Sequence, residues 1–176
     1  MRGRIYIAHK DDKGRIQTIK EHSENTASLC EEYAIDELKS YAYIIGLLHD
    51  IGKYTDSFKE RIGGKNIRVE HSIYGAHEIG KLFADKFDKL FRLVAQYCIA
   101  GHHSGIPNGG GLNDTAKDST LHGRLNRQYE DYSKYKSDLT LPKVDTTTFT
   151  KYILEGCGDK NIDMLYDKFH GWKLTS

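Results

Sequence analysis

The stretch "GLLHDIGK", residues 46–53, ends an apolar run with a histidine and an aspartate side by side. The residues before it, "YAYII" at 41–45, extend that run and predict the buried face of a helix. His49 and Asp50 therefore stand at the end of this helix, with side chains about 100° apart around its axis. Because adjacent His and Asp residues often arise by chance, the meaning of the pair depends on the rest of the chain.

The composition predicts one soluble globular domain of 176 residues, 38% of them hydrophobic and 29% charged. No apolar run is long enough for a transmembrane helix, and the first residues, "MRGRIYIAHKDDKG", lack the apolar core of a signal peptide. The three cysteines show no paired spacing, which favours a cytoplasmic location and argues against a cysteine-ligated zinc site. A net charge of +1 gives no strong electrostatic footprint for nucleic acid, so a bound strand requires a local basic patch or delivery by another protein.

Helical periodicity dominates the first hundred residues and predicts an all-α domain. Five helices are expected over residues 20–34, 36–50, 55–64, 70–87 and 88–105. A short strand or extended arm is expected at 5–9 and a glycine-rich loop at 104–114. The polar tail after residue 115 is expected to hold two or three further helices.

The same spacing predicts the side chains that face inward and the residues that end the helices. In the first helix the predicted inner face holds His22, Thr26, Leu29, Cys30 and Tyr33. In the second, with Asp36 as its N-cap, it holds Tyr41, Ile44, Ile45 and Leu48. The third is expected to begin at Thr55 and to stop at Gly63 and Gly64. In the fifth, the inner face holds Leu90, Phe91, Val94, Ala95, Cys98 and Ile99.

Five histidines recur at the ends of these helices, on the side that leans toward the core. His22 lies near the start of the first helix, His49 ends the second, His71 opens the fourth, and His102 and His103 close the fifth. A buried imidazole without a partner costs about 1–3 kcal/mol, and a single one is ordinarily a core histidine bonded to a carbonyl. Five of them with a neighbouring aspartate are better satisfied by a shared cation.

The adjacent pair suits two metal ions rather than one. His49 and Asp50 can flank a metal pair, with the two carboxylate oxygens bridging both ions. Imidazole with carboxylate favours Mn, Ni, Co, Fe or Zn and also admits Mg. Two neighbouring ions are the usual device for phosphoester hydrolysis. Lys53, one turn after His49, either stabilises negative charge that develops on the phosphate or is a solvated lysine at a helix end.

The order of these motifs resembles a known family. His22, "LLHDIGK", "EHSIYGA" and "AGHHSGIPNGG" follow one another as in the HD superfamily of metal-dependent phosphohydrolases. Within it, the "GHHSG" element and the opening "IAHKDDKG" followed by "EH" are similar to the HD nuclease domain of the type I CRISPR interference nuclease-helicase. The resemblance covers about residues 5–112, and the tail at 113–176 shows little to align.

The resemblance implies an α-helical HD bundle with up to two divalent ions at helix ends, which cleaves single-stranded DNA during defence against invading DNA. By position, His22, His49 and Asp50 would hold one ion, and the second ion would be held by Asp50, His71, His102 and His103. Asp50 and Lys53 would be catalytic, and the implied partners are single-stranded DNA, a CRISPR helicase domain or subunit, and a type I effector complex, with no membrane. His9 matches a family position without being assigned as a ligand, and three histidines fall outside the motif: His77, His122 and His170.

One departure from the family concerns a further aspartate that a late helix usually supplies. Asp159, Asp163 and Asp167 are the candidates, but their surroundings are polar. We therefore expect unequal sites, with one ion bound well and the second weakly. The helicase is also missing, so the chain is expected to be a stand-alone subunit or an excised amino-terminal domain.

Two other functions stay open at this point. One is an HD phosphohydrolase that acts on a nucleotide, and the other is a metal-stabilised module without enzymatic activity that docks onto a larger complex. In the stretch 117–136, basic side chains alternate with tyrosines. This pattern is consistent with a surface along which single-stranded nucleic acid binds, or with a helix face exposed to solvent. Its basic residues and tyrosines are Lys117, Arg124, Arg127, Tyr129, Tyr132, Lys134, Tyr135 and Lys136.

Overall fold

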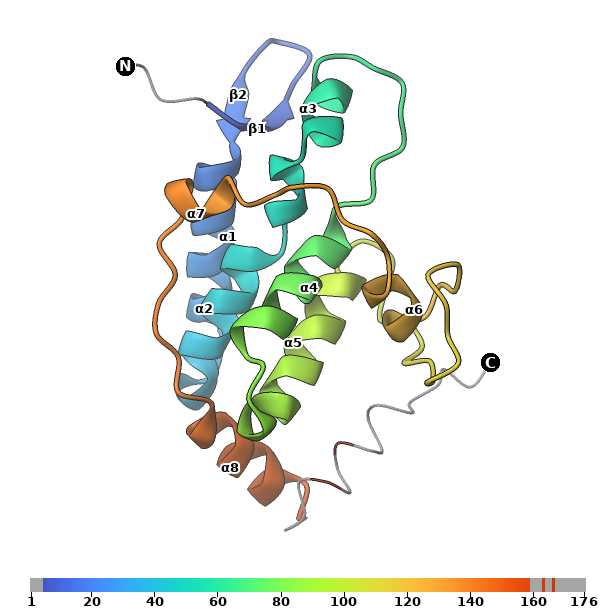
Figure 1. The fold of residues 1–176 in the computed structure, drawn as a ribbon. Helices are drawn as coiled ribbons and strands as arrows, with labels where there is room; N and C mark the ends of the chain where they lie inside the picture. Colours follow the sequence, from blue (N-terminus) through green and yellow to red (C-terminus); the bar gives the residue numbers. More distant parts are fainter. Residues whose placement is uncertain (1–4, 159–162, 164–165, 167–176) are drawn as a thin grey trace.

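The computed structural model describes residues 5–158 together with 163 and 166 (Figure 1). The strands β1 (Ile7–Lys10) and β2 (Ile16–Thr18) form an antiparallel hairpin, in which His9 pairs with Gln17. The helices are α1 (Ile19–Tyr33), α2 (Lys39–Leu48), α3 (Asp56–Ile62), α4 (Ser72–Leu82), α5 (Lys89–Gly101), α6 (Leu121–Leu125), α7 (Tyr135–Asp138) and α8 (Thr146–Gly156). Three short 3-10 helices join them: η1 (Asp36–Leu38), η2 (Ile51–Tyr54) and η3 (Lys86–Asp88). The predicted all-α class is confirmed, and residues 7–9 of the segment expected at 5–9 lie in strand β1.

The four helices α1, α2, α4 and α5 alternate in direction along the chain (Figure 1). α1 packs against α2, α4 packs against α5, and α2 also contacts both α4 and α5. Because the directions alternate, the start of α1, the end of α2, the start of α4 and the end of α5 all lie at the same end of the bundle. This topology brings helix ends from four separate stretches of sequence together.

Helix α1 starts at a capping box, in which Thr18 and Glu21 satisfy each other's backbone N–H groups. Its predicted inner face is wrong, because Leu29 and Tyr33 are 51% and 83% exposed. The buried residues are instead Ile19, Ser23 and Ala27. α1 and α2 approach so closely that a Cβ atom on Gly46 would lie 2.8 Å from the Cα atom of Ala27. Only small residues fit at such a contact, and an apolar pattern does not reveal them.

The boundaries of the next helices differ in detail from the sequence prediction. Asp36 does not cap α2; it starts η1 and pairs with Lys39 at 2.6 Å. Thr55 does cap α3, since its hydroxyl accepts a hydrogen bond from the Phe58 amide, and the helix stops at Gly63 as predicted. The predicted helix at 70–87 ends at Leu82, because Asp85 caps the separate turn η3 through the Phe87 amide.

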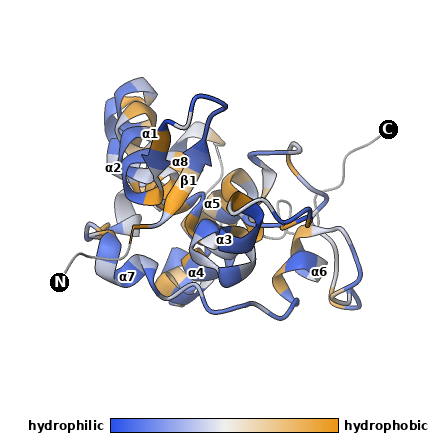
Figure 2. Ribbon diagram, turned by 90° about the horizontal axis from the view of Figure 1, so that it is seen from above, coloured by the Kyte–Doolittle hydropathy of each residue, from blue (hydrophilic) through white to orange (hydrophobic). Residues whose placement is uncertain are grey.

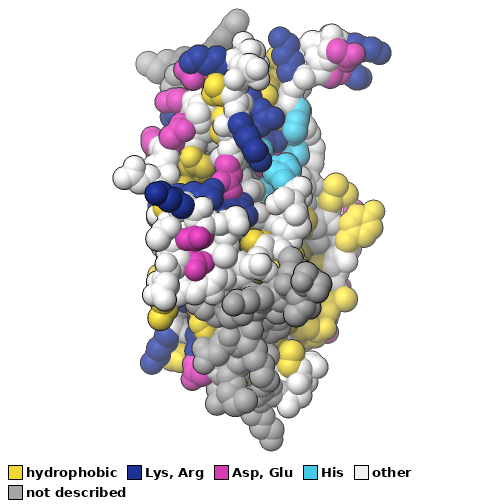
Figure 3. Space-filling view, turned by 90° about the vertical axis from the view of Figure 1, so that its right-hand side faces the viewer, with side chains coloured by type: hydrophobic (Ala, Val, Ile, Leu, Met, Phe, Trp, Pro, Cys, Tyr) yellow, Lys and Arg dark blue, Asp and Glu magenta, His cyan; other side chains and the backbone are white. Residues whose placement is uncertain are grey.

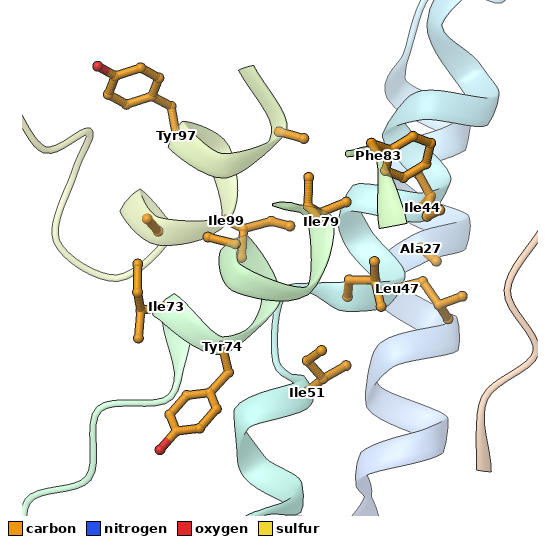
Figure 4. Close-up of a cluster of buried hydrophobic side chains, with 14 of the residues drawn as sticks. Ala27, Ile44, Leu47, Ile51, Ile73, Tyr74, Ile79, Phe83, Tyr97 and Ile99 are labelled. Atoms are coloured by element: carbon orange, nitrogen blue, oxygen red, sulfur yellow. The ribbon is translucent and has the colours of Figure 1, made fainter. Parts of the chain in front are cut away.

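The hydrophobic core lies between α1, α2, η2, α4 and α5 (Figure 4). As predicted, α2 buries Tyr41, Ile44 and Leu48. Within α5, Cys98 is exposed although it was predicted to face inward, and its neighbours Tyr97 and Ile99 are buried. A Cβ atom on Gly75 would lie 2.2 Å from the carbonyl oxygen of Leu48, so glycine is required where α4 crosses the end of α2.

Up to residue 158, the segment after the glycine-rich loop forms the helices α6, α7 and α8, and the rest of the predicted tail lies mostly outside the described residues. Seen from above, the connecting loops are mostly hydrophilic, and hydrophobic residues lie on the helices (Figure 2). α8 packs its Phe149 ring against Tyr41 and Phe91 at the far end of the bundle from the hairpin. Among the described residues, no helix is both long and apolar enough to cross a membrane.

Candidate metal centre

Asp50 lies at the end of the bundle where the four helix ends meet, and it is only 2% exposed. Its two carboxylate oxygens face different side chains. Oδ2 lies 2.9 Å from Nε2 of His22 and 3.1 Å from Nε2 of His49. Oδ1 lies 3.3 Å from Nε2 of His71 and 3.4 Å from Nε2 of His102. The aspartate therefore stands between two pairs of imidazoles.

His103 joins the second pair, since its Nε2 lies 2.6 Å from Nε2 of His71. All six residues predicted as ligands thus converge, and they form two groups that share Asp50. We call His22, His49 and Asp50 the Oδ2 group. We call Asp50, His71, His102 and His103 the Oδ1 group. Within each group, the potential ligand atoms lie within 4.8 Å of one another.

Gly52, in the "HDIGK" stretch, lets η2 pack closely against the start of α4. A Cβ atom on Gly52 would lie 2.3 Å from the carbonyl oxygen of His71. Real Cβ atoms do not come so close to a carbonyl oxygen, so only glycine lets η2 lie against the start of α4. This contact places Asp50 and His71, which are far apart in sequence, within reach of each other.

Two of the imidazoles are oriented by backbone carbonyls. Nδ1 of His49 lies 2.6 Å from the carbonyl oxygen of Gly46, and Nδ1 of His102 lies 2.7 Å from that of Ile99. A ring that donates from Nδ1 carries its lone pair on Nε2, and in both rings Nε2 faces Asp50. A hydrogen bond from the far nitrogen to a carbonyl is the usual support of a metal-binding histidine.

The surroundings of Asp50 fit a divalent transition-metal ion. Oδ1 of Asp50 is buried and makes no hydrogen bond. Burial alone would raise the pKa of Asp50, but hydrogen bonds that the rings of His102, His22, His49 and His71 donate when they carry a proton on Nε2 hold it well below its usual range. Desolvation and the neighbouring rings of His102 and His71 lower the pKa of His103, which keeps that ring in the neutral, metal-binding form. Neutral imidazoles around an ionised carboxylate are the donors that such ions prefer.

Comparison with protein families identifies the chain. The model of the HD domain family matches residues 19–142, which is more than half of the sequence. This protein belongs to the HD domain family. The comparison with curated proteins finds no match. Membership implies a metal-dependent phosphohydrolase, and the histidine and aspartate cluster is where this HD domain could hold its metal. The role of each residue as a ligand stays a prediction.

Lys53 is buried beside Asp50 in the candidate metal centre, which contradicts the alternative of a solvated lysine. Its side chain is 4% exposed, and its Nζ lies 2.8 Å from Oδ2 of Asp50. Nζ also lies 3.0 Å from Nε2 of His9 on strand β1. Desolvation and the Lys53 ammonium lower the pKa of His9, so its ring stays neutral and accepts a hydrogen bond from Lys53. Sequence reasoning gave His9 no role, and its matching motif position was the only signal.

The other histidines lie away from the centre or outside the described residues. The ring of His77 stacks on Tyr129 at a centroid distance of 3.9 Å, and its Nδ1 lies 2.9 Å from the hydroxyl of Tyr132. His122 lies in α6, which joins neither of the two groups. His170 lies outside the described residues.

Three of the residues named in the stretch 117–136 are buried and so belong to neither a single-strand path nor a solvated face: Arg124, Tyr132 and Tyr135. Arg124 is buried and donates to Glu70, to Ser72 and to the carbonyl oxygen of Ala100. The hydroxyls of Tyr132 and Tyr135 are also buried, and both donate to one carboxylate on α4. These side chains tie the segment onto α4 and α5, because each finds a buried polar partner there.

The Oδ2 group offers three candidate ligands, and no further described residue adds a fourth. Of the candidate aspartates, Asp163 is exposed and pairs with Lys89 at the start of α5. Because α5 has 13 residues, that position lies about 18 Å from the end of the helix where His102 stands. Asp159 and Asp167 lie outside the described residues.

The centre opens onto the surface beside His71 and His103, where histidine and basic side chains lie next to each other (Figure 3). Two open hollows meet there, of about 710 and 610 Å³. Arg61, Lys65 and Arg68 line the larger one. Arg68 is exposed and makes no hydrogen bond or ion pair with any other described residue.

Proposed function

We propose that this HD domain is a metal-dependent nuclease that cleaves single-stranded DNA in type I CRISPR interference. The observation that carries the proposal is the buried carboxylate of Asp50, shared by two groups of imidazoles that open onto a basic surface. The specific nuclease role also draws on the resemblance of "GHHSG" and "IAHKDDKG" to that class of domain.

Each group would hold one ion. Asp50, His71, His102 and His103 supply four ligands, and His22, His49 and Asp50 supply three. When bound, the two ions would activate a water molecule for attack on phosphorus and neutralise charge on the phosphate oxygens.

The protein's own groups prepare this chemistry. The carbonyl groups of Gly46 and Ile99 orient His49 and His102, so that little reorganisation is needed on binding. Lys53 brings a buried positive charge next to Asp50, where it stabilises negative charge that develops on the phosphate. His9 accepts a hydrogen bond from Lys53 and fixes its position.

The shape of the surface favours a polymer over a small nucleotide. A pocket for a small ligand encloses about 70–90% of its surface. The hollows beside His71 and His103 are open, so a strand can lie along them. Arg61, Lys65 and Arg68 offer positive charge to its phosphates. Since the net charge of the chain is only +1, we further propose that a CRISPR helicase domain or subunit, with a type I effector complex, delivers the strand.

A cleavage assay tests this function. Purified protein with Mn, Ni or Co should degrade linear and circular single-stranded DNA much faster than duplex DNA. Lys53→Ala should lower the rate without removing the metal, because Lys53 is not a ligand. Robust hydrolysis of a nucleotide panel with intact DNA would instead favour a nucleotide phosphohydrolase.

A further inference from the structure

A third hollow lies on the other side of α3 from the basic surface, between that helix and the β1–β2 hairpin. Its volume is about 370 Å³, within the usual range for ligand pockets of about 300–1,000 Å³. Its apolar lining comes from Ile5, Tyr6, Ile7, Ile16 and Ile62. We call it the hairpin hollow.

Three lysines complete the hairpin hollow: Lys10, Lys53 and Lys59. Lys10 and Lys59 are exposed, and neither side chain makes an ion pair or hydrogen bond with another described residue. Lys53 is the buried lysine whose Nζ lies 2.8 Å from Oδ2 of Asp50. The hollow therefore combines an apolar lining with unpaired positive charge, and one of its residues touches the metal centre.

An occupant that matches this lining has a flat apolar part and a negative charge. A nucleotide has both, because its base stacks on aromatic rings and its phosphate binds lysine. The ring of Tyr6 is placed for such a contact, since it lines the hollow and is held by Tyr54 at a centroid distance of 5.0 Å.

We propose that the hairpin hollow binds one nucleotide of the single strand, next to the phosphodiester that lies at the metal centre. The base lies against Tyr6 and the isoleucines, and the phosphate lies between Lys10 and Lys59. α3 then separates the two parts of the strand, because Lys59 and Ile62 face the hairpin hollow while Arg61 faces the basic surface. This inference rests on the proposed nuclease function.

The test measures strand binding without catalysis. A fluorescent oligothymidylate is titrated into the full chain in the presence of EDTA at several salt concentrations. The variant Lys10→Gln/Lys59→Gln is compared with Lys143→Gln/Lys151→Gln, whose two exposed lysines lie at or near α8, at the opposite end of the molecule. Loss of two phosphate contacts should flatten the slope of log affinity against log salt by about 1.4 in the first variant and leave the second unchanged.

Photo-crosslinking gives an independent readout of the same hollow. An oligonucleotide that carries 5-iodouracil should crosslink to Tyr6, as mapped by mass spectrometry. An unchanged salt slope in Lys10→Gln/Lys59→Gln, crosslinks that avoid Tyr6, or a parent protein that binds no oligonucleotide would each overturn the proposal. The nuclease function fails separately, if the metal-loaded parent protein binds the strand but does not cleave it.

Discussion

Asp50 and Glu78 are both buried carboxylates, each 2% exposed, and their surroundings are opposite. Glu78 accepts hydrogen bonds from two neutral hydroxyls, that of Tyr132 at 2.7 Å and that of Tyr135 at 2.6 Å. Asp50 faces imidazoles and one ammonium group, and its Oδ1 makes no hydrogen bond. Burial of a carboxylate therefore does not by itself indicate a functional site. The groups that face the carboxylate distinguish a functional site from a structural one.

The difference assigns the two carboxylates to different tasks. Tyr132 precedes α7 and Tyr135 is its first residue, so Glu78 holds the start of α7 against α4. Both of its oxygens accept a hydrogen bond, and the Lys81 and Lys136 ammonium groups, each 3.7 Å away, already balance its charge. Around Asp50, ring nitrogens lie close together in pairs, 3.2 Å apart for His22 and His49 and 2.6 Å apart for His71 and His103, and a proton or a cation between them removes their repulsion. Asp50 is thus built for a ligand, and Glu78 for stability.

The largest expected effect comes from Asp50→Ala, which removes the residue that both groups share. Metal-dependent cleavage of single-stranded DNA should fall to background, while circular dichroism keeps the helical signal because the core lies elsewhere. The matched control is Glu78→Gln, which should keep its metal content and activity. Full activity in Asp50→Ala would remove the distinction between the two carboxylates.

Glu78→Ala should act on stability instead. Each tyrosine hydroxyl that loses its buried acceptor costs about 1–3 kcal/mol of unfolding free energy. The cost for Tyr132 should lie at the low end, because Nδ1 of His77 lies 2.9 Å from its hydroxyl and offers another acceptor. Urea denaturation in EDTA measures the loss. Undiminished stability together with lost metal binding would reverse the roles of Asp50 and Glu78.

Gly52→Ala should disturb the centre through packing. Its new Cβ atom would lie 2.3 Å from the carbonyl oxygen of His71, so η2 and α4 must move apart. Such overpacking costs about 1–3 kcal/mol, and metal affinity should fall with it because Asp50 and His71 separate. Gly111→Ala is the control, since a Cβ atom there meets nothing within 4 Å. Thermal melts with and without Mn separate the two effects, and equal behaviour of the two variants would contradict the close approach.

The smallest expected effect is a pH dependence that belongs to Glu78. Burial would raise the pKa of Glu78, but the hydroxyls of Tyr135 and Tyr132 and the nearby Lys81 and Lys136 hold it below its usual value. Its stabilising contribution is therefore present above the unfolded pKa of about 4.3 and is lost as pH falls through the lower folded value. In EDTA, the melting temperature of the parent protein should drop more steeply below about pH 4.3 than that of Glu78→Gln. Parallel curves would show that Glu78 does not titrate in this way.

The sequence predicts which polar residues come together better than it predicts the packing. The sequence indicates His49, His71 and His102 because each is a polar residue at the end of an apolar helix. Helices that alternate in direction then bring such ends together. The face of α1 was predicted wrongly because Ala27 packs against Gly46, a contact of small residues with little hydrophobic signal.

Buried polar partners are a second limit of the sequence. The tyrosines of the 117–136 stretch have the same spacing whether they face solvent or Glu78, 54 and 57 residues away in sequence. His9 shows the same limit, since its contact with Lys53 spans 44 residues. Spacing indicates where a helix ends, but a long-range partner becomes visible only in the fold.

The central claim is that Asp50 is shared by two ions of unequal affinity. The Oδ1 group offers four candidate ligands, whereas the Oδ2 group offers three and has the Lys53 ammonium 2.8 Å from its carboxylate oxygen. Calorimetric titration of Mn into the parent protein and Asp50→Ala, with elemental analysis after desalting, tests this directly. We predict one tightly held ion and one weak ion in the parent protein, and neither in Asp50→Ala. Two ions that survive desalting, or a tight ion that persists in Asp50→Ala, would contradict the account.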